Sequence, residues 1–224
     1  MRERFRADVR ARIVDAAHAQ IAASGPTAIS LRAIARDLTM APSAVHRYFA
    51  TRDDVLTALM VREFEALGDA LAAAEMAVRD RQDYAGRAVA VFIAHRDWAL
   101  ACPHSWSLLY GSPVPGYVEP GEVCAAAARF FTLMTAISLE AGHEVVCGHG
   151  WAEPHDALVE LPEGAPTTVP TWQLTTGLAA YSWMIGAITA EVRGFFVDFV
   201  ADHTALYRAG VTHWVTALGF NPSP

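Results

Sequence analysis

The sequence predicts an all-α fold, and its composition carries most of that prediction. Alanine, the residue with the highest helix propensity, occupies 43 of 224 positions, and all 17 basic residues are Arg. Alternating runs of Val, Ile and Thr, which are typical of strands, are scarce. Hydrophobic residues make up 53% of the chain and charged residues 18%, which excludes a disordered protein. We therefore expect a compact helical core with one appended module.

The first predicted helix covers residues 5 to 24. Its apolar residues recur three or four positions apart, as they do on one face of a helix, and they are Phe5, Val9, Ile13, Ala16, Ala17 and Ile21. The dipeptide Gly25-Pro26 ends this helix, because glycine is a common helix terminator and proline cannot continue one. Its charged face is rich in Arg.

Two short helices follow. Ser30 precedes a helix over 31–38 as its N-cap, and Pro42 begins a third helix after a connection over 39–41. The side chains expected on the inner side of the third helix are Val45, Tyr48 and Phe49. Two short helices joined by a tight turn and preceded by a longer one form a helix-turn-helix head.

The rest of the chain predicts a helical ligand-binding and dimerisation domain. Its helices are expected over 55–76, 84–102, 104–110, 123–141, 172–199 and 202–218. Residues 111–117 predict a loop and 142–170 a long surface segment. The last two helices are apolar almost all round, so they need burial, and a second copy of the chain is one way to supply it. The apolar stretch 177–190 is too short to span a bilayer, so we expect no membrane anchor.

The charge is divided unevenly between the two predicted domains. Residues 1–54 carry nine Arg against six acidic residues, and residues 55–224 carry eight Arg against 18. A basic head on an acidic body favours nucleic-acid binding by the head, although a solvated basic face gives the same count. The candidate DNA-binding residues are Ser30, Arg32, Thr39, Pro42, Ser43, Ala44, His46, Arg47, Tyr48 and Arg52.

The third helix carries the chemistry for reading base edges. Ser43 can donate or accept a hydrogen bond, and Ala44 can touch a thymine methyl. Arg47 can bind guanine with both arms of its guanidinium or pair with a phosphate. Tyr48 and Arg52 are better placed for the DNA backbone. Short helical corners also occur in bundles that bind no DNA.

Aromatic and sulfur side chains of the body are candidates for a ligand pocket. They share the central helices with two polar residues, and ordinary core packing is the alternative for most of them. The candidates are Phe92, His95, Trp98, Trp106, Tyr110, Phe131, Met134, Trp172, Thr176, Tyr181, Trp183 and Met184.

Two other classes of function compete with DNA binding. The sequence holds no Gly-x-Ser-x-Gly elbow, phosphate-binding Gly loop or His-Glu-x-x-His helix, so we expect neither an enzyme nor a cofactor. A metal-sensing regulator is the alternative function, with candidate ligands on the 143–156 loop at His143, Cys147, His149, His155 and Asp156. Paired Cys-x-x-Cys spacing is absent, so no metal site is assigned. Three scattered cysteines and no leader-like opening indicate a cytoplasmic protein.

The head resembles a known family. The run Ser30–Phe49 reads SLRAIARDLTMAPSAVHRYF, and Thr51–Leu56 reads TRDDVL. Over about residues 8 to 62 the chain is similar to the DNA-binding domain of TetR/AcrR-type transcriptional regulators. In that family a Lys or Arg three residues beyond the Phe holds a phosphate, and Arg52 fills this place.

Two residues depart from the family pattern. Thr39 stands where the family usually has Gly, at a turn where a positive φ is most costly for a β-branched residue. His46 stands where the family usually has a Tyr that often contacts DNA. The imidazole makes a proton-dependent contact possible, and a neutral ring facing solvent is the alternative.

The body resembles the TetR subgroup named for a Trp-His-Gly motif. The resemblance rests on Trp98–Pro103 and Leu108–Tyr117, and Gly186–Glu191 looks like the continuation of the motif. Ile185 stands in place of its His and Tyr181 in place of its Trp, so no role of that His is carried over. The resemblance implies an inducer site for an unknown small-molecule effector and a homodimer through the last two long helices.

Together these features predict a ligand-responsive transcriptional regulator, most simply a repressor. We expect the homodimer to bind a near-palindromic operator in double-stranded DNA, since one short helix reads only a few base pairs. Ligand binding in the body would lower operator affinity by favouring the state that binds DNA less well.

Overall fold

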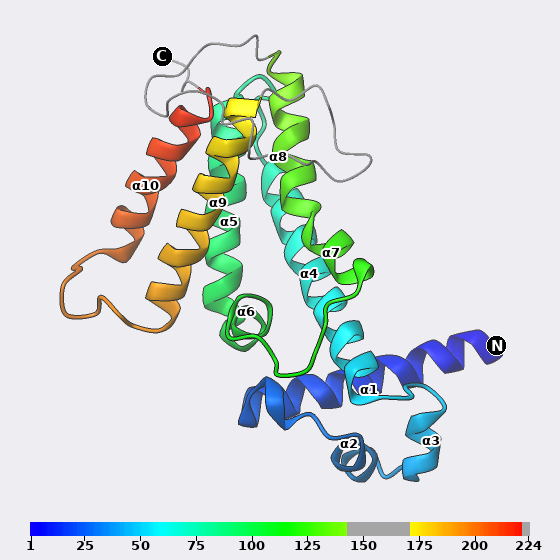
Figure 1. Ribbon diagram of the computed structural model, residues 1–224. Coiled ribbons are helices and arrows are strands. Elements are labelled where there is room, and N and C mark those ends of the chain that lie inside the picture. The colour runs from blue at the N-terminus through cyan, green and yellow to red at the C-terminus, as the bar shows by residue number, and fades with distance from the viewer. Residues whose placement is uncertain (143–170, 221–224) are drawn as a thin grey trace. The chain divides into compact units, whose positions relative to one another are not determined.

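The computed structural model describes residues 1–142 and 171–220, and every regular element in these ranges is helical, as predicted (Figure 1). The elements are α1 (Arg2–Ser24), the short 3-10 helix η1 (Pro26–Ala28), α2 (Leu31–Asp37), α3 (Pro42–His46), α4 (Arg52–Met76), α5 (Tyr84–Ala101), α6 (Pro103–Tyr110), α7 (Gly121–Ala127), α8 (Arg129–Glu140), α9 (Thr171–Val192) and α10 (His203–Ala217). No single described helix is long and apolar enough to cross a membrane, whereas α7 and α8 counted together meet that criterion.

The chain divides into two compact units. The head unit comprises Met1–Gly68 and Cys102–Arg129, and the body unit comprises Asp69–Ala101 and Phe130–Pro224. This division falls within α4, whereas the boundary of the DNA-binding domain that the sequence predicts lies after residue 54. The first boundary separates compactly packed units, and the second separates predicted functions. The functional boundary stays a prediction.

One apolar core holds the head unit together. The buried face of α1 packs with residues of α2, α3, α4 and the segment after α3. This core includes Ile13 and Ile21 of α1, Ile34 of α2, Val45 of α3, Phe49 after α3, and Leu56 and Leu59 of α4. Leu108 of α6 and Val123 of α7 belong to the same core. Two polar contacts also hold α6 and the segment before α7 to this core. His18 Nε2 lies 3.2 Å from the hydroxyl oxygen of Ser105, and Thr57 Oγ1 lies 2.9 Å from the hydroxyl oxygen of Tyr117.

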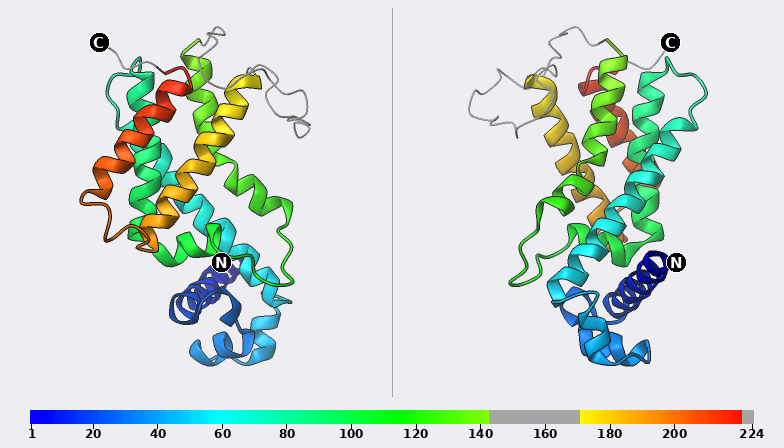
Figure 2. Two further views of the ribbon diagram at one scale, coloured as in Figure 1. Left: turned by 60° about the vertical axis from the view of Figure 1, so that its left-hand side comes forward. Right: turned by 90° about the vertical axis from the view of Figure 1, so that its right-hand side faces the viewer.

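In the body unit, α5, α9 and α10 pack against one another, as both views of Figure 2 show. The Tyr207 hydroxyl of α10 donates a hydrogen bond of 2.9 Å to the backbone oxygen of Phe92 on α5. Arg96 of α5 binds both carboxylate oxygens of Glu191 on α9, and it also donates to the Thr204 hydroxyl on α10. One buried guanidinium therefore joins all three helices.

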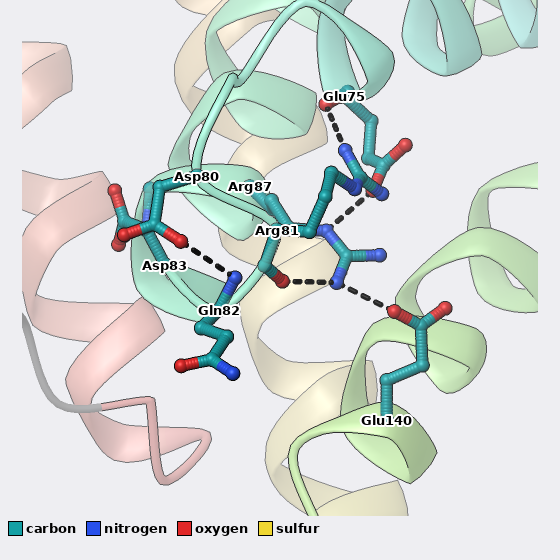
Figure 3. A network of polar contacts seen from close by, with 8 residues as sticks. Glu75, Asp80, Arg81, Gln82, Asp83, Arg87 and Glu140 are labelled. Carbon is teal, nitrogen blue, oxygen red and sulfur yellow. Dashed lines mark hydrogen bonds and ion pairs between the residues drawn. The ribbon is translucent and has the colours of Figure 1, made fainter.

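A second buried arginine anchors the start of α5 (Figure 3). Only 2% of the Arg87 side chain is exposed, and it contacts Glu75 near the end of α4 and Glu140 at the end of α8. Its Nη1 also donates to the backbone oxygen of Arg81, whose own side chain pairs with Glu75. The hydrogen bond from Arg87 lowers the pKa of Glu140, and the two carboxylates raise the pKa of Arg87. Each charge in this network has a partner, as burial requires.

Two predicted helices differ from the observed ones, one by an interruption and one by an earlier end. The single helix predicted over 123–141 is interrupted at Ala128, although its alanines favour a helix. The interruption adjoins Arg129, which donates to the backbone oxygen of Glu65 and lies against Gly68, so tertiary contacts override local propensity there. The helix predicted over 172–199 ends at Val192, because Gly194 takes a positive φ of 68° and terminates it.

Packing between α9 and α10 depends on the absence of a side chain at Gly210. A Cβ atom built there would overlap the Trp183 indole, which stacks on Tyr207 with 5.4 Å between ring centroids. We expect Gly210→Ala to lower the free energy of unfolding by about 1–3 kcal/mol, the usual cost of overpacking. Urea denaturation monitored by circular dichroism measures this change.

Gly177→Ala is the matched control, since it makes the same exchange within α9. A Cβ atom at Gly177 would meet only Leu218, at 4.0 Å. This variant should be neutral or up to about 1 kcal/mol more stable, because Ala favours a helix over Gly. Equal behaviour of the two variants would contradict the packing argument.

Candidate nucleic-acid interface

The segment from α2 to α3 has the geometry of a helix-turn-helix. Ser30 caps α2, since its hydroxyl accepts a hydrogen bond of 3.4 Å from the backbone N–H of Ala33. The Gln20 side chain of α1 accepts from the Ser30 N–H and donates to the Asp37 carboxylate, so it holds both ends of α2. Ser30, predicted as a DNA-binding residue, therefore has a local structural role.

The turn between the helices passes through Thr39. Thr39 has a φ of 55°, and it is the only non-glycine residue with a positive φ in the described part of the chain. The N–H of Thr39 binds the Arg36 oxygen at 3.0 Å, and the N–H of Met40 binds the Ala35 oxygen at 2.8 Å. These two bonds form a Schellman motif, in which the residue with positive φ is usually Gly.

Glycine occupies the corresponding position where α9 and α10 end. Gly194 binds the Glu191 oxygen while Phe195 binds the Ala190 oxygen, both at 2.9 Å. Gly219, with a φ of 93°, makes the equivalent bonds after α10. The same hydrogen-bond pattern thus occurs with Gly at two helix ends and with Thr at the turn of the head.

The outer face of α3 is exposed. Pro42, Ser43, His46 and Arg47 are exposed, Ala44 and Tyr48 are half-buried, and Val45 is fully buried. A five-residue helix fixed by its one buried side chain therefore presents its polar residues to solvent. This is the arrangement that base reading in a major groove requires.

His46 makes a local contact. Its Nδ1 lies 3.2 Å from the backbone oxygen of Ala50, and because a carbonyl can only accept, Nδ1 is the donor. The Nε2 atom is then left to face a ligand. A proton-dependent contact by His46 stays a prediction.

The remaining predicted contacts lie on both sides of the turn. Arg32 is exposed on α2, and Arg52 is half-buried in the first turn of α4. The start of α4 is capped reciprocally, since Asp54 N–H donates to the Thr51 hydroxyl and Thr51 N–H donates to the Asp54 carboxylate. Arg52 lies between the two capping residues, so the capping fixes its backbone at the start of α4.

Sequence reasoning missed one residue of this region, Arg10. Its Nη1 donates to the backbone oxygen of Tyr48 at 2.8 Å, and its guanidinium carbon lies 4.2 Å from the centre of the Phe49 ring. Arg10 thus ties α1 to the end of α3 by a hydrogen bond and a cation–π contact. The Arg-rich face of α1 was the available signal, but contacts between residues 38 positions apart have no local pattern.

The predicted ligand-pocket residues are divided between the two units. Trp106 and Tyr110 belong to the head unit, where their ring centroids are 4.3 Å apart. Trp183 of the body unit faces α10, stacked on Tyr207 and near Trp214. The other candidates in the body unit are Phe92, His95, Trp98, Phe131, Met134, Trp172, Thr176, Tyr181 and Met184.

An aromatic cluster in the body unit surrounds His95. Its ring contacts Phe130 and Tyr181, and Phe131 contacts both of these aromatic residues. Burial lowers the pKa of His95 to about 3, so its imidazole is neutral. Phe130, at the centre of the cluster, was not among the predicted residues, although it precedes Phe131 in the sequence.

The predicted metal loop, residues 143–156, lies outside the described residues. Within the described ranges no group of three or more His, Cys, Asp and Glu side chains is placed to hold a metal ion.

Known proteins resemble both halves of the chain. The family profile described as "Bacterial regulatory proteins, tetR family" matches residues 13–59, and the profile described as "Tetracyclin repressor-like, C-terminal domain" matches residues 87–214. The HTH-type transcriptional regulator Rv1816 of Mycobacterium tuberculosis is 41% identical over 124 residues, which make up 55% of this chain and 52% of that protein. The chain therefore spans about half the length of the curated relatives it matches.

Solved structures extend the similarity to nearly the whole chain. The crystal structure of regulatory protein SCO4313 has a TM-score of 0.77 and 30% identity, covering 96% of this chain and 99% of that one. A TetR family transcription regulator from Marinobacter aquaeolei has a TM-score of 0.62, covering 96% and 98% respectively. At 15% sequence identity, this match shows similarity of fold alone. None of the matches names the Trp-His-Gly subgroup, which stays a prediction.

The strain at Thr39 is testable. A β-branched residue with positive φ costs about 1–2 kcal/mol, and glycine removes that cost. We expect Thr39→Gly to raise the free energy of unfolding by about 1 kcal/mol, since the greater freedom of glycine in the unfolded chain offsets part of the gain. Chemical denaturation measures the difference.

Gly194→Thr is the reciprocal control, because a Cβ atom at Gly194 meets nothing within 4 Å and only backbone strain is added. It should lose about 1–2 kcal/mol. A Thr39→Gly variant that is less stable than the parent would show that the Thr39 side chain stabilises the turn.

Proposed function

This chain belongs to the TetR family of transcriptional regulators, and from that premise we propose that it represses transcription by binding a near-palindromic operator as a homodimer. A small molecule bound in the body would release it from DNA. The observation that carries the proposal is the exposed face of α3, with Ser43, His46 and Arg47 held outward by buried Val45. The cytoplasm, where the DNA lies, is the expected location.

Arg47 is the strongest candidate for a base or phosphate contact. It is exposed and makes no ion pair with any described side chain, so its donors are open to a ligand. Ser43 and Ala44 precede it on the same helix and match the polar and methyl groups of base edges. We expect Arg32, on α2, and Arg52, at the start of α4, to bind phosphates.

Dimerisation through α9 and α10 supplies the second half-site. Leu178 of α9 and Leu206 of α10 are half exposed, and a groove of about 500 Å³ lies between the two helices, lined in part by Gly186, Ala187 and Gly210. Small residues permit close approach of helix backbones, and apolar side chains supply the driving force. A second copy of this chain is the occupant that we propose for this surface.

The effector is proposed to bind in the body unit, near the aromatic cluster of His95, Phe130 and Tyr181. The neutral His95 ring lies among aromatic side chains, and small-molecule sites are lined mainly by apolar and aromatic residues with a few polar groups. The effector changes operator affinity only if it binds the DNA-free state more tightly. If a saturating concentration of effector leaves operator affinity unchanged, this part of the proposal is wrong.

DNA recognition is tested by selecting binding sequences from a randomised duplex pool and measuring affinity by fluorescence anisotropy. We expect two inverted half-sites to be enriched. Arg47→Ala should weaken binding to the selected duplex by about 5- to 150-fold, which corresponds to 1–3 kcal/mol.

Arg193→Ala is the control for charge, since Arg193 is exposed in the turn after α9. It should bind the selected duplex within about twofold of the parent. Failure of the selection to enrich any sequence would rule out operator binding by this head.

The dimer surface is tested with Leu206→Glu. Leu206 is 55% exposed and lines the groove between α9 and α10, so a buried charge there should convert the dimer to a monomer. Sedimentation velocity over a range of concentrations measures the change.

Leu139→Glu is a closely matched control, because Leu139 is 54% exposed but lies on α8. It should remain a dimer. Dimerisation that survives Leu206→Glu, or is abolished equally in both variants, would place the interface elsewhere.

A further inference from the structure

The head unit contains an open groove between α1 and the helix-turn-helix. We call it the arginine groove; its volume is about 930 Å³. Three of its lining residues are arginines, Arg6 and Arg12 on α1 and Arg47 after α3. Phe5, Val9 and Tyr48 supply its apolar lining. The predicted DNA contacts do not include the α1 residues of this groove.

The positive charge of the groove is not neutralised by the described side chains. Arg6, Arg12 and Arg47 make no ion pair with any of them, and all three are exposed. Elsewhere in the head unit, Arg62 pairs with Asp15 and Glu63. A groove lined by three arginines that pair with no described side chain favours an anion.

The position of α1 relative to α3 is fixed within the head unit. Val9 is buried in the core, and Arg10 contacts the Tyr48 oxygen and the Phe49 ring. Arg6 and Arg12 therefore flank the groove on a rigid helix. Six residues of a helix span about 9 Å, a distance over which one DNA strand presents more than one phosphate.

We propose that the first three turns of α1 are a second DNA-contacting element, in which Arg6 and Arg12 bind phosphates of the duplex that α3 reads. This inference rests on the proposed function, because Arg47 belongs both to the groove and to the DNA-facing side of α3. A strand that reaches Arg47 would continue along the groove, with its phosphates at the guanidiniums and its sugars against the apolar lining. Arginine suits this role, since its planar fork binds two phosphate oxygens at once. The family profile for the head begins at residue 13, so this element lies outside the matched region.

Phosphate binding is independent of sequence, so the test uses a mixed-sequence 30-bp duplex. Its affinity for the full-length protein is measured by fluorescence anisotropy from 50 to 200 mM KCl. For the double variant Arg6→Gln and Arg12→Gln, the plot of log affinity against log salt should become less steep by about 0.9 for each phosphate that is no longer bound, or about 1.8 per protomer. The affinity at 50 mM KCl should fall about tenfold or more. The double Lys variant, which keeps both charges, should retain most of the slope.

Arg4→Gln is the matched control, because Arg4 is an exposed arginine of α1 that does not line the groove. It should leave the slope within about 0.3 of the parent's. Thermal melts monitored by circular dichroism check that each variant is folded.

Two results would overturn the inference alone: an unchanged slope in the folded double variant, or an equal decrease in Arg4→Gln. Selection of operator sequences by the same double variant separates this result from the proposed function. The variant should still enrich the parent's half-sites, because α3 is intact. A parent protein that binds no duplex at all would overturn both.

Discussion

The position of α3 depends on two buried side chains, Val45 within the helix and Phe49 just after it. A helix of five residues cannot persist alone in water, since nucleating a helix costs more than one or two hydrogen bonds return. Val45 and Phe49 bury α3 in the core formed by α1, α2 and α4, and burial of an apolar side chain of this size contributes about 1.5–3 kcal/mol. Arg10 adds contacts to the Phe49 ring and the Tyr48 backbone. The outward direction of Ser43, His46 and Arg47 follows from this anchoring.

The turn before α3 adds a second constraint on the same helix. Thr39 holds a backbone conformation that glycine adopts freely, and its two Schellman bonds are as short as those at Gly194. Strain of this kind persists only where the surrounding structure fixes the chain, and it concentrates at functional segments. Buried Ile34 on one side and buried Val45 on the other hold the turn in place. The head therefore forms a Schellman turn with Thr39 at the position that glycine usually occupies.

The sequence predicted what local signals encode. Ser30 and Pro42 marked the starts of α2 and α3, and Gly25 marked the end of α1. Contacts between distant residues could not be predicted from the sequence. No local pattern indicates that α6 and α7 complete the core of the head unit, or that Arg10 contacts the Phe49 ring. The break at Ala128 belongs to the same class, since its cause lies in α4. The end of α9 differs, because Gly194 was a readable stop signal that the apolar run around it obscured.

Along α5 in the body unit, ionic contacts lie near the two ends of the helix and apolar contacts lie between them. Arg87 near its start and Arg96 near its end are buried and fully paired, and removing one partner of such a pair leaves an uncompensated charge. Both ends of α5 are therefore tied to specific carboxylates on α4, α8 and α9. Between them lie Val91, Phe92 and the aromatic cluster of His95, where contacts are non-directional and side chains can repack at smaller cost.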